Sequence, residues 1–386
     1  MLHTSPRGTT ACAFCWVNPK QDEGETIIRI AEATLSPFIR ALFEASGSNA
    51  YEAPIVAQHL IDASLAGHDS HGLIRAPKYL GWVRQGAVIA NRHAEPFIDS
   101  GAVLGIDGGF GYGQVIGREA MELAIPRANA NGFCMVGIRN SGHLGRIGAW
   151  PEQLAAAGLV SLHFVNTSGF GILVAPFGAS ERRLSANPIA AGAPGPDYPI
   201  VLDISTAATA EGKIQVARNK GDRMPPGQML DGAGKPTDDP EAFYGSPLGA
   251  ILPFGAHKGS GLSVFCELLA GSLTGGGASN PANPTAGKLV NNMLTLVFNP
   301  GVFRDAAGFR ADLAGLVTWM RSARPIEPGA EILLPGELER RTRVDRQRHG
   351  IPVDRVTAHQ LIEAASLLEV TAPDLLWRAS QELENG

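Results

Sequence analysis

The spacing of hydrophobic residues predicts three helices near the start of the chain. Apolar residues recur there at intervals of three and four, which is the period of an amphipathic helix. The predicted helices span residues 30–47, 52–67 and 75–86. Two of these stretches end on Gly47 and Gly67, and glycine is common just past the end of a helix. The polar stretch HDSHG separates the second helix from the third.

From about residue 96 the pattern changes to glycine-rich alternation of short apolar runs and amphipathic stretches. The apolar runs predict strands at 102–107, 133–139, 159–165, 198–205 and 291–300. The amphipathic stretches predict helices at 114–132, 150–158, 208–218, 257–276 and 358–370. An arginine-rich segment, 336–350, precedes the last of these helices. Alternation of strands and helices, flanked by helices at both ends, predicts an α/β core.

Composition narrows the class of protein. The chain has 386 residues with a net charge of −5, and its 32 Lys and Arg are scattered, so no nucleic-acid partner is expected. The apolar runs are too short for a bilayer span, so no membrane partner is expected. The first 24 residues read as a loose tail without the apolar core of a secretory signal, and a Cys12–Cys15 pair there has no second pair. Four cysteines favour a reducing, cytoplasmic location.

A glycine-rich turn, GIDGGFGYGQVIG, follows a predicted strand and precedes a predicted helix, as a dinucleotide-binding loop does. Its glycines do not have the G-x-G-x-x-G spacing, because the third position falls on Gln114 in one register and on Ile116 in the other. The sequence therefore does not support an ordinary Rossmann loop. A turn that packs or shapes a cleft remains the alternative.

The stretch HDSHGLIR places polar chemistry at a helix exit. Ser70 beside His71 can bind a polar substrate, and Arg75 can hold a carboxylate through a two-pronged contact. His68 and His71 have a spacing that metal sites use, but the third ligand and the glutamate of a zinc-protease motif are absent. A polar loop that caps a helix is the alternative interpretation.

His143 lies between glycines in NSGHLGRIG, directly after a predicted buried strand. An imidazole titrates near neutral pH, so it can take a proton from a hydroxyl and return it. At the end of such a strand it would face the crevice in which α/β sheets bind ligands. The alternative is a histidine that satisfies loop carbonyls.

Two further motifs suit parts of a nucleotide. Asp203, in VLDIST, can accept hydrogen bonds from ribose hydroxyls, or it can cap the following helix. His257 and Lys258, in PFGAHKGSG, stand at a predicted helix N-terminus, where backbone N–H groups, the helix dipole and a lysine favour an anion. A structural turn is the alternative for this second motif, which lacks the P-loop spacing.

The order of these motifs resembles the malate/L-lactate dehydrogenase family of the second type. The resemblance rests on DSHGLIRAPKYLGWVRQG, NSGHLGRIG, APFGASERRLSANPIA, VLDIST and PFGAHKGSGL, and it covers about residues 26 to 370. That family includes ureidoglycolate, sulfolactate and diketogulonate dehydrogenases and a piperideine-2-carboxylate reductase. The resemblance implies a non-Rossmann, sulfolactate-dehydrogenase-like α/β fold with a mixed sheet core, and a homodimer.

The resemblance also implies roles for individual residues. His143 matches the proton-accepting histidine, and Ser70 with His71 matches the catalytic pair on the substrate side. Arg75 and Tyr79 are the expected substrate-binding residues. The expected cofactor-binding residues are Thr167, Asp203, Ile204, Ser205, His257, Lys258 and Gly259. The LPGE segment, 334–337, resembles a late segment that returns to the cofactor, and the role of Arg146 stays open.

The expected domains follow from the alternation of strands and helices between helical ends. Residues 1–24 are the tail, and 25–95 are the N-terminal helical segment of a substrate domain. Residues 96–333 are the cofactor-binding α/β core. Residues 334–386 are expected to pack with the N-terminal helices, which makes the helical domain discontinuous.

The implied reaction is hydride exchange between a nicotinamide cofactor and C2 of a small 2-hydroxy or 2-oxo acid, with His143 as general acid and base. An NADPH-dependent reductase of cyclic imines is the alternative enzyme. A metal-dependent hydrolase built on His68, His71, His143 and Asp203, or a non-catalytic binding protein, are alternatives from other classes. Asp203 near a ribose favours NAD over NADP.

Arginines keep NADP open, because they can meet a 2′-phosphate. The candidates are Arg182, Arg183 and Arg218. The residues therefore leave the choice between NAD and NADP undecided, with a preference for NAD.

Overall fold

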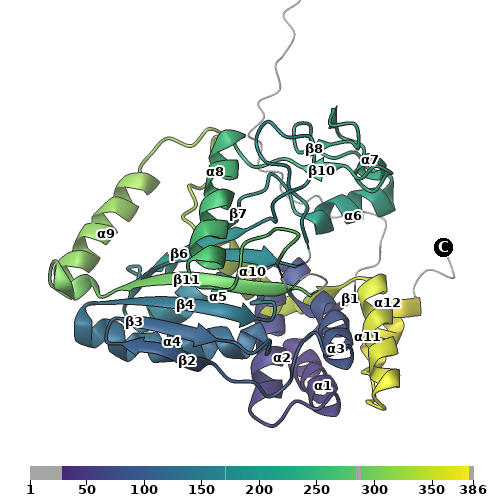
Figure 1. Ribbon diagram of the computed structural model, residues 1–386, viewed down its shortest axis with the longest axis horizontal. Helices are drawn as coiled ribbons and strands as arrows, with labels where there is room; N and C mark the ends of the chain where they lie inside the picture. The colour runs from purple at the N-terminus through teal and green to yellow at the C-terminus, as the bar shows by residue number, and fades with distance from the viewer. Residues whose placement is uncertain (1–27, 170, 284, 286–287, 382–386) are drawn as a thin grey trace, which may run out of the picture.

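A mixed sheet of seven strands forms the centre of the molecule (Figure 1). The computed structural model describes residues 28–381 except 170, 284, 286 and 287, so the predicted tail with Cys12 and Cys15 lies outside the described residues. In spatial order the strands are β2 (Glu95–Ser100), β3 (Val103–Asp107), β4 (Phe133–Ser141), β11 (Val290–Phe298), β5 (Val160–Ser168), β6 (Pro188–Ala193) and β7 (Ile200–Ser205).

The direction of the strands separates this sheet from a Rossmann sheet. Only β3 and β4 run parallel, and the other neighbouring pairs are antiparallel. The long strand β11 joins the two halves, with Thr295 opposite Val136 of β4 and His163 of β5. Dinucleotide-binding Rossmann sheets are mostly parallel. The predicted α/β fold with a mixed, non-Rossmann sheet is confirmed.

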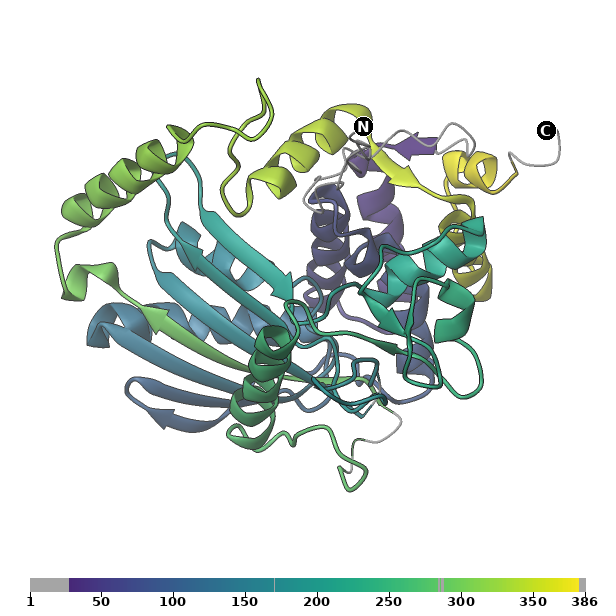
Figure 2. The same ribbon diagram turned by 90° about the horizontal axis from the view of Figure 1, so that it is seen from above.

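Helices cover both faces of the sheet. The core segment contains α4 (Gly113–Asn131), α5 (Ala149–Ala156), α6 (Glu211–Lys220), α7 (Pro240–Phe243), α8 (His257–Cys266), the π-helical turn η3 (Glu267–Ser272), η4 (Pro300–Val302) and α9 (Ala306–Arg321). α4 and α5 pack on one face, and α8 with η3 packs on the other (Figures 1 and 2). α4 ends where Gly132 adopts a left-handed φ of 78°, as the sequence predicts.

The terminal segments share one hydrophobic core. They contain β1 (Ile28–Ile30), α1 (Glu32–Ala45), α2 (Glu52–Leu65), η1 (Asp69–His71), η2 (Leu73–Arg75), α3 (Ala76–Arg84), α10 (Glu337–His349), β12 (Ile351–Val353), α11 (Arg355–Leu367) and α12 (Asp374–Gln381). Leu42 and Leu60 lie in the same buried cluster as Leu361 and Leu376. β1 also pairs with β12, so the first and last described segments are joined by backbone hydrogen bonds. The predicted association of the two ends is confirmed, whereas the exact domain limits stay a prediction.

Several predictions of local structure were wrong or incomplete. The helix predicted over 257–276 is α-helical to Cys266 and then continues as the π-helical turn η3. The arginine-rich segment is helix α10, and neither α9 nor strand β6 was predicted. A small sheet of β10 (Ala250–Ile251), β8 (Met229–Leu230) and β9 (Pro236–Thr237) was also missed, because strands of two residues carry no readable periodicity.

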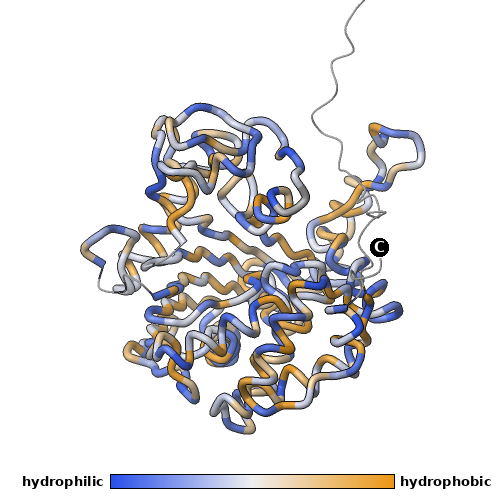
Figure 3. Tube along the Cα trace, turned by 90° about the vertical axis from the view of Figure 1, so that its right-hand side faces the viewer, coloured by the Kyte–Doolittle hydropathy of each residue, from blue (hydrophilic) through white to orange (hydrophobic). Residues whose placement is uncertain are grey.

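The distribution of hydropathy follows this architecture. The central strands of the sheet carry many hydrophobic residues, and the helices alternate between hydrophobic and hydrophilic residues (Figure 3). Within the described residues, no helix is long and apolar enough to cross a membrane.

Candidate active site

Two glycine-rich turns pack against each other and position His143. A Cβ on Gly142 would lie 2.5 Å from the carbonyl oxygen of Gly111, and a Cβ on Gly113 would lie 2.3 Å from that of His143. Real Cβ atoms do not approach carbonyl oxygens this closely, so both contacts require glycine. The turn that failed the dinucleotide fingerprint therefore shapes the backbone around the imidazole, as its alternative interpretation proposed.

Tyr79 and Gln114 hold the inner side of the His143 ring. The Tyr79 hydroxyl, from α3, lies 2.6 Å from Nδ1 of His143. Nε2 of Gln114, in the first turn of α4, donates to the Tyr79 hydroxyl and to the carbonyl oxygen of His143, both at 3.1 Å. Nε2 of His143 has no hydrogen-bond partner among the described residues, so this nitrogen is left to meet a ligand.

His71 stacks against His143. The centroids of the two rings are 5.5 Å apart, and their planes differ by 22°. Ser70 Oγ lies 2.9 Å from Nδ1 of His71. The structure therefore brings the predicted pair Ser70–His71 together with His143, although the residues come from different elements.

A guanidinium flanks the two imidazoles. Arg75 donates from Nε to the carbonyl oxygen of Ser70 at 2.6 Å, and its partner in the described part of the chain is this carbonyl rather than a carboxylate. The positive charge of Arg75 therefore remains available for an anionic group of a ligand.

Burial and this charge keep both imidazoles neutral. Burial lowers the pKa of His143 well below its usual range, and the nearby Arg75 charge lowers it further. The same two causes, in the same order, lower the pKa of His71. Burial raises the pKa of the Tyr79 hydroxyl to about 12, so Tyr79 keeps its proton at neutral pH.

Sequence reasoning missed the residues that support the His143 loop from behind. Nε2 of His59, on α2, accepts a hydrogen bond from the backbone N–H of Arg146 at 3.0 Å. Its ring packs on Trp150 with a centroid distance of 5.2 Å, and burial lowers its pKa to about 3. His59 therefore stays neutral, and its Nε2 accepts a hydrogen bond from the loop. Its surroundings in the sequence contain no motif that could have indicated this role.

Arg146, whose role the sequence left open, is buried behind the same loop. Its guanidinium pairs with the carboxylate of Glu152. The carboxylate of Asp203 accepts from the backbone N–H of Gly148 at 2.7 Å, and burial raises its pKa. Asp203 thus holds the end of the His143 loop. Its predicted contact with a ribose stays a prediction.

Some of the other predicted cofactor residues lie at the start of α8. A Cβ on Gly259 would lie 2.6 Å from the carbonyl oxygen of Thr206, so the end of β7, with Ile204 and Ser205, packs directly on this helix start. Thr167 Oγ1, at the end of β5, accepts from Asn291 Nδ2 at 2.9 Å. These contacts bring Ile204 and Ser205 close to Gly259, whereas the hydroxyl of Thr167 bonds to strand β11.

The N-terminus of α8 fits an anionic group. Ala256, at the N-cap, has a φ of 57°, which a residue with a Cβ rarely adopts and which local packing must maintain. His257 and Lys258 follow it in the first turn, and both side chains are exposed. The backbone N–H groups of Lys258 and Gly259 already donate to the carbonyl oxygens of Gly255 and Phe254. An exposed imidazole and ammonium at the positive end of the helix dipole can still hold the phosphates of a nucleotide.

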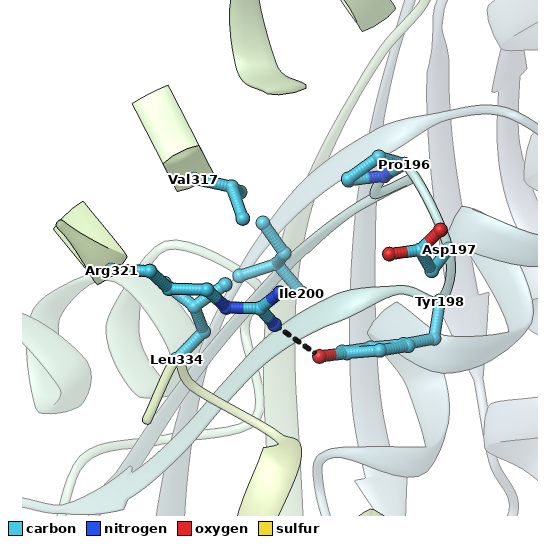
Figure 4. A pocket seen from close by; sticks show the side chains of 7 residues that line it. All are labelled: Pro196, Asp197, Tyr198, Ile200, Val317, Arg321 and Leu334. Carbon is cyan, nitrogen blue, oxygen red and sulfur yellow. Dashed lines mark hydrogen bonds between the residues drawn. The ribbon is translucent and has the colours of Figure 1, made fainter. Parts of the chain in front are cut away.

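The late segment LPGE is joined to helix α9 by an ion pair. Arg321 donates to the Tyr198 hydroxyl at 2.6 Å (Figure 4). Arg321 also pairs with the carboxylate of Glu337 at the same distance. The other oxygen of Glu337 accepts from the backbone N–H of Leu334 at 2.6 Å. The contacts of Glu337 are therefore structural, and the predicted return of this segment to the cofactor stays untested.

Within the described part of the chain, no group of three or more His, Cys, Asp or Glu side chains is arranged to hold a metal ion. His68, one of the residues of the hydrolase alternative, lies 3.5 Å from the carboxylate of Glu339 on α10.

The sequence and the fold of this chain are similar to those of known proteins. The family model described as malate/L-lactate dehydrogenase matches residues 30–362. Hydroxycarboxylate dehydrogenase B of Escherichia coli (strain K12) is 42% identical over 342 residues, which cover 87% of this chain and 93% of the relative. The structure of sulfolactate dehydrogenase from Methanocaldococcus jannaschii has a TM-score of 0.81 at 32% identity and covers 90% of this chain and 99% of its own.

A third neighbour bears on the alternative enzyme. The structure of delta1-piperideine-2-carboxylate reductase from Pseudomonas syringae pvar. tomato has a TM-score of 0.76 at 30% identity, with 88% of this chain and 100% of that chain covered. The mixed sheet separates this fold from the Rossmann class, and the relatives from Escherichia coli and Methanocaldococcus jannaschii are named as dehydrogenases. The chain belongs to the malate/L-lactate dehydrogenase family. The predicted family, fold and class of enzyme are confirmed.

Proposed function

We propose that this protein is an NAD(P)-dependent oxidoreductase of small 2-hydroxy and 2-oxo acids in which His143 exchanges a proton with the substrate oxygen. The observation that carries the proposal is the arrangement around His143. Nδ1 is held by Tyr79 at 2.6 Å, the ring stacks on His71, and Nε2 is free of protein partners among the described residues. A fixed imidazole with one free nitrogen suits general acid–base catalysis.

The neighbouring residues have complementary roles in the proposal. Arg75 binds the substrate carboxylate, since its guanidinium lies beside both imidazoles without a carboxylate partner in the described part of the chain. Ser70 and His71, which lie beside His143, hydrogen-bond the substrate. These contacts fix the substrate oxygen near Nε2 of His143, and such positioning supplies a large part of the rate in enzymes of this kind.

The cofactor supplies or removes the hydride at C2 when it is bound. His257, Lys258 and Gly259 would hold its phosphates at the start of α8. Thr167, Asp203, Ile204 and Ser205 would line the rest of its site, as the resemblance implies.

The contacts of three arginines support NAD over NADP. Arg182 donates to the carbonyl oxygen of Phe243 at 3.0 Å and stacks on its ring, Arg183 pairs with Glu181, and Arg218 pairs with Glu241. All three guanidinium groups therefore have partners within the protein. A 2′-phosphate would have to compete with these partners.

A cyclic imine reductase is the second candidate, and similarity to the Pseudomonas syringae reductase favours it. A protonated imine carries its positive charge at the reacting bond. The cations Arg75 and Lys78 lower the pKa of His143, so the charge around this imidazole is already positive. Repulsion from that charge favours a 2-oxo acid over a cationic imine.

The proposal includes a homodimer and a cytoplasmic location. Helix α9 buries only Val317 among its described side chains, while Trp319 is 76% exposed and Leu316 is 52% exposed. An apolar face of this kind supports association with a second copy. Cys134 and Cys266 are buried free thiols, which suits a reducing compartment.

A panel of substrates and cofactors tests the proposal. The purified protein is incubated with 2-oxo acids and with cyclic imine carboxylates, each with NADH and with NADPH, and the loss of nicotinamide absorbance is recorded. The proposal predicts that 2-oxo acids with NADH give the highest kcat/KM. Turnover of cyclic imines alone would establish the second candidate, and turnover of neither class would reject both.

A further inference from the structure

The Tyr79 hydroxyl has two hydrogen-bond neighbours and one hydrogen to donate. Nε2 of Gln114 lies 3.1 Å from the phenolic oxygen, and Nδ1 of His143 lies 2.6 Å from it. Both Tyr79 and Gln114 are 1% exposed. Bulk water therefore does not supply alternative partners, and the directions of these two bonds determine where the protons lie.

The side-chain amide of Gln114 has one acceptable orientation. Its Nε2 lies 3.1 Å from the carbonyl oxygen of His143 as well as from the Tyr79 hydroxyl. A carbonyl oxygen only accepts, so the group that faces it must be the NH₂. The reversed amide would place two carbonyl oxygens against each other. Gln114 therefore donates to the Tyr79 oxygen.

This orientation determines the remaining bond. The Tyr79 oxygen accepts a hydrogen bond from Gln114, and its other partner in the described part of the chain is Nδ1 of His143. If Nδ1 donated to the oxygen as well, the buried O–H would have no acceptor, so the O–H donates to Nδ1. Nδ1 then accepts, and a neutral imidazole that accepts at Nδ1 carries its hydrogen on Nε2. The hydrogen of the neutral ring thus lies on the nitrogen that is free to meet a ligand.

We propose that Tyr79, oriented by Gln114, fixes the Nε2–H tautomer of His143 and delivers its phenolic proton to Nδ1 when Nε2 gives its proton to the substrate oxygen. This inference rests on the proposed function. Tyr79 acts through His143, so it is a positioning residue that also relays a proton.

The relay balances in both directions. In reduction the C2–O double bond becomes a single bond, with the electron pair from the reduced nicotinamide, and the oxygen takes the Nε2 proton. Nδ1 takes the phenolic proton as the Tyr79 O–H bond breaks, and the tyrosinate, held by the Gln114 N–H, later regains a proton from solvent. In oxidation each transfer reverses, so the Tyr79–His143 pair must first lose one proton. Reduction therefore begins from the protonated pair, and oxidation begins from the deprotonated pair.

The electrostatics of the site agree with this assignment. Burial and Arg75 lower the pKa of His143, so an imidazolium is not the stored proton donor at neutral pH. Burial raises the pKa of Tyr79 to about 12, so its proton is present when reduction begins.

Nuclear magnetic resonance of the full chain labelled with ¹⁵N in its histidine rings tests the tautomer without substrate or cofactor. The His143 signals are identified by their loss in His143→Gln. We expect a protonated Nε2 and an unprotonated Nδ1 in the original protein, and a mixture of tautomers in Tyr79→Phe. A protonated Nδ1 in the original protein would overturn the inference and leave the proposed function intact.

The pH dependence of reduction separates a relay from a structural role. Tyr79→Phe should lose about 10²-fold in kcat near neutral pH, and this loss should shrink as pH falls, because an imidazolium can then supply the proton. An equal loss at every pH would contradict the relay. The control is Tyr112→Phe, because Tyr112 is buried 6.3 Å from the Tyr79 ring and is not a hydrogen-bond partner of His143. Tyr112→Phe should retain the His143 tautomer and the original pH profile.

Discussion

The imidazole rings of His71 and His143 stack with their centroids 5.5 Å apart. His71 is the last residue of η1 in the terminal helical segment, and His143 follows strand β4 of the core. The site therefore forms where two separately built hydrophobic clusters meet. Protonating both neighbouring imidazoles would place two positive charges side by side, which is unfavourable. Burial and the charge of Arg75 lower the pKa of both rings, so both stay neutral.

Removing the charge of Arg75 should weaken substrate binding more than turnover. A charge-assisted hydrogen bond contributes roughly 1.5–3 kcal/mol, so Arg75→Gln should raise KM for the acid substrate by about 10- to 100-fold. The same change should raise the pKa of His143, because the cation lowers it. Steady-state kinetics measures the first effect, and titration of the ring signals measures the second. Arg84→Gln, at the exposed end of α3, is the matched control.

Lys258 should contribute to cofactor binding and not to proton transfer. Lys258 lies in the first turn of α8, and the cofactor phosphates are expected to bind at this end of the helix. Lys258→Ala should raise the dissociation constant of NADH by about 10-fold, by fluorescence titration. Lys235→Ala removes a lysine from the turn between β8 and β9 and should leave binding unchanged. If the original protein, Lys258→Ala and Lys235→Ala bind NADH with equal affinity, Lys258 does not contact the phosphates.

His163 should make stability depend on pH in the acid range. It is buried between Thr295 and Ser161, with 2.9 Å to each hydroxyl, and burial lowers its pKa from 6.5 to about 3. As pH falls below about 6.5, the unfolded chain binds a proton that the folded chain refuses, so the free energy of unfolding falls by about 1.4 kcal/mol per pH unit from this residue. Urea denaturation between about pH 6.5 and about pH 5 measures the slope.

A variant isolates the contribution of His163 from that of other buried groups, including His59. His163→Gln should have a lower free energy of unfolding at neutral pH and a slope smaller by about 1.4 kcal/mol per pH unit. Identical slopes in the two proteins would show that the folded protein protonates His163 as readily as the unfolded chain.

The exposed face of α9 should be required for self-association. Trp319 is 76% exposed on a helix that packs weakly on the rest of the chain. Sedimentation should show a dimer for the original protein and a monomer for Trp319→Asp, because a carboxylate in an apolar interface is costly. Trp377→Asp, on α12, is the control and should remain dimeric. A monomeric original protein would contradict the homodimer directly.

The spacing of hydrophobic residues along the chain predicted several helices of this fold. The amphipathic period located α1, α2 and α4, and Gly132 marked the end of α4. Helix α9 was not predicted, although its apolar residues also recur with a helical period, and only Val317 of its described side chains is buried. The π-helical turn at Glu267 was not predicted either. It depends on a tertiary contact, because the buried Glu267 carboxylate accepts from Asn166 and Asn187 at 2.9 and 2.8 Å.

The candidate site shows the same division. His143, Ser70 and His71 were identified from short motifs, and the fold brings them together. Gln114 appeared in the sequence only as the residue that breaks a glycine spacing. In the fold it bonds Tyr79 and the backbone of His143. No local pattern connects α3, α4 and the His143 loop, so their convergence required the tertiary structure.

The most direct test of the central claim is His143→Ala, measured for both turnover and cofactor binding. A positioned acid–base group contributes on the order of 10²–10⁴ in rate, so kcat should fall by that factor in both directions. The dissociation constant of NADH should stay within about twofold, because His143 bonds Tyr79 rather than the residues at the start of α8. A kcat close to that of the original protein would contradict the role of His143 as the proton-exchanging group.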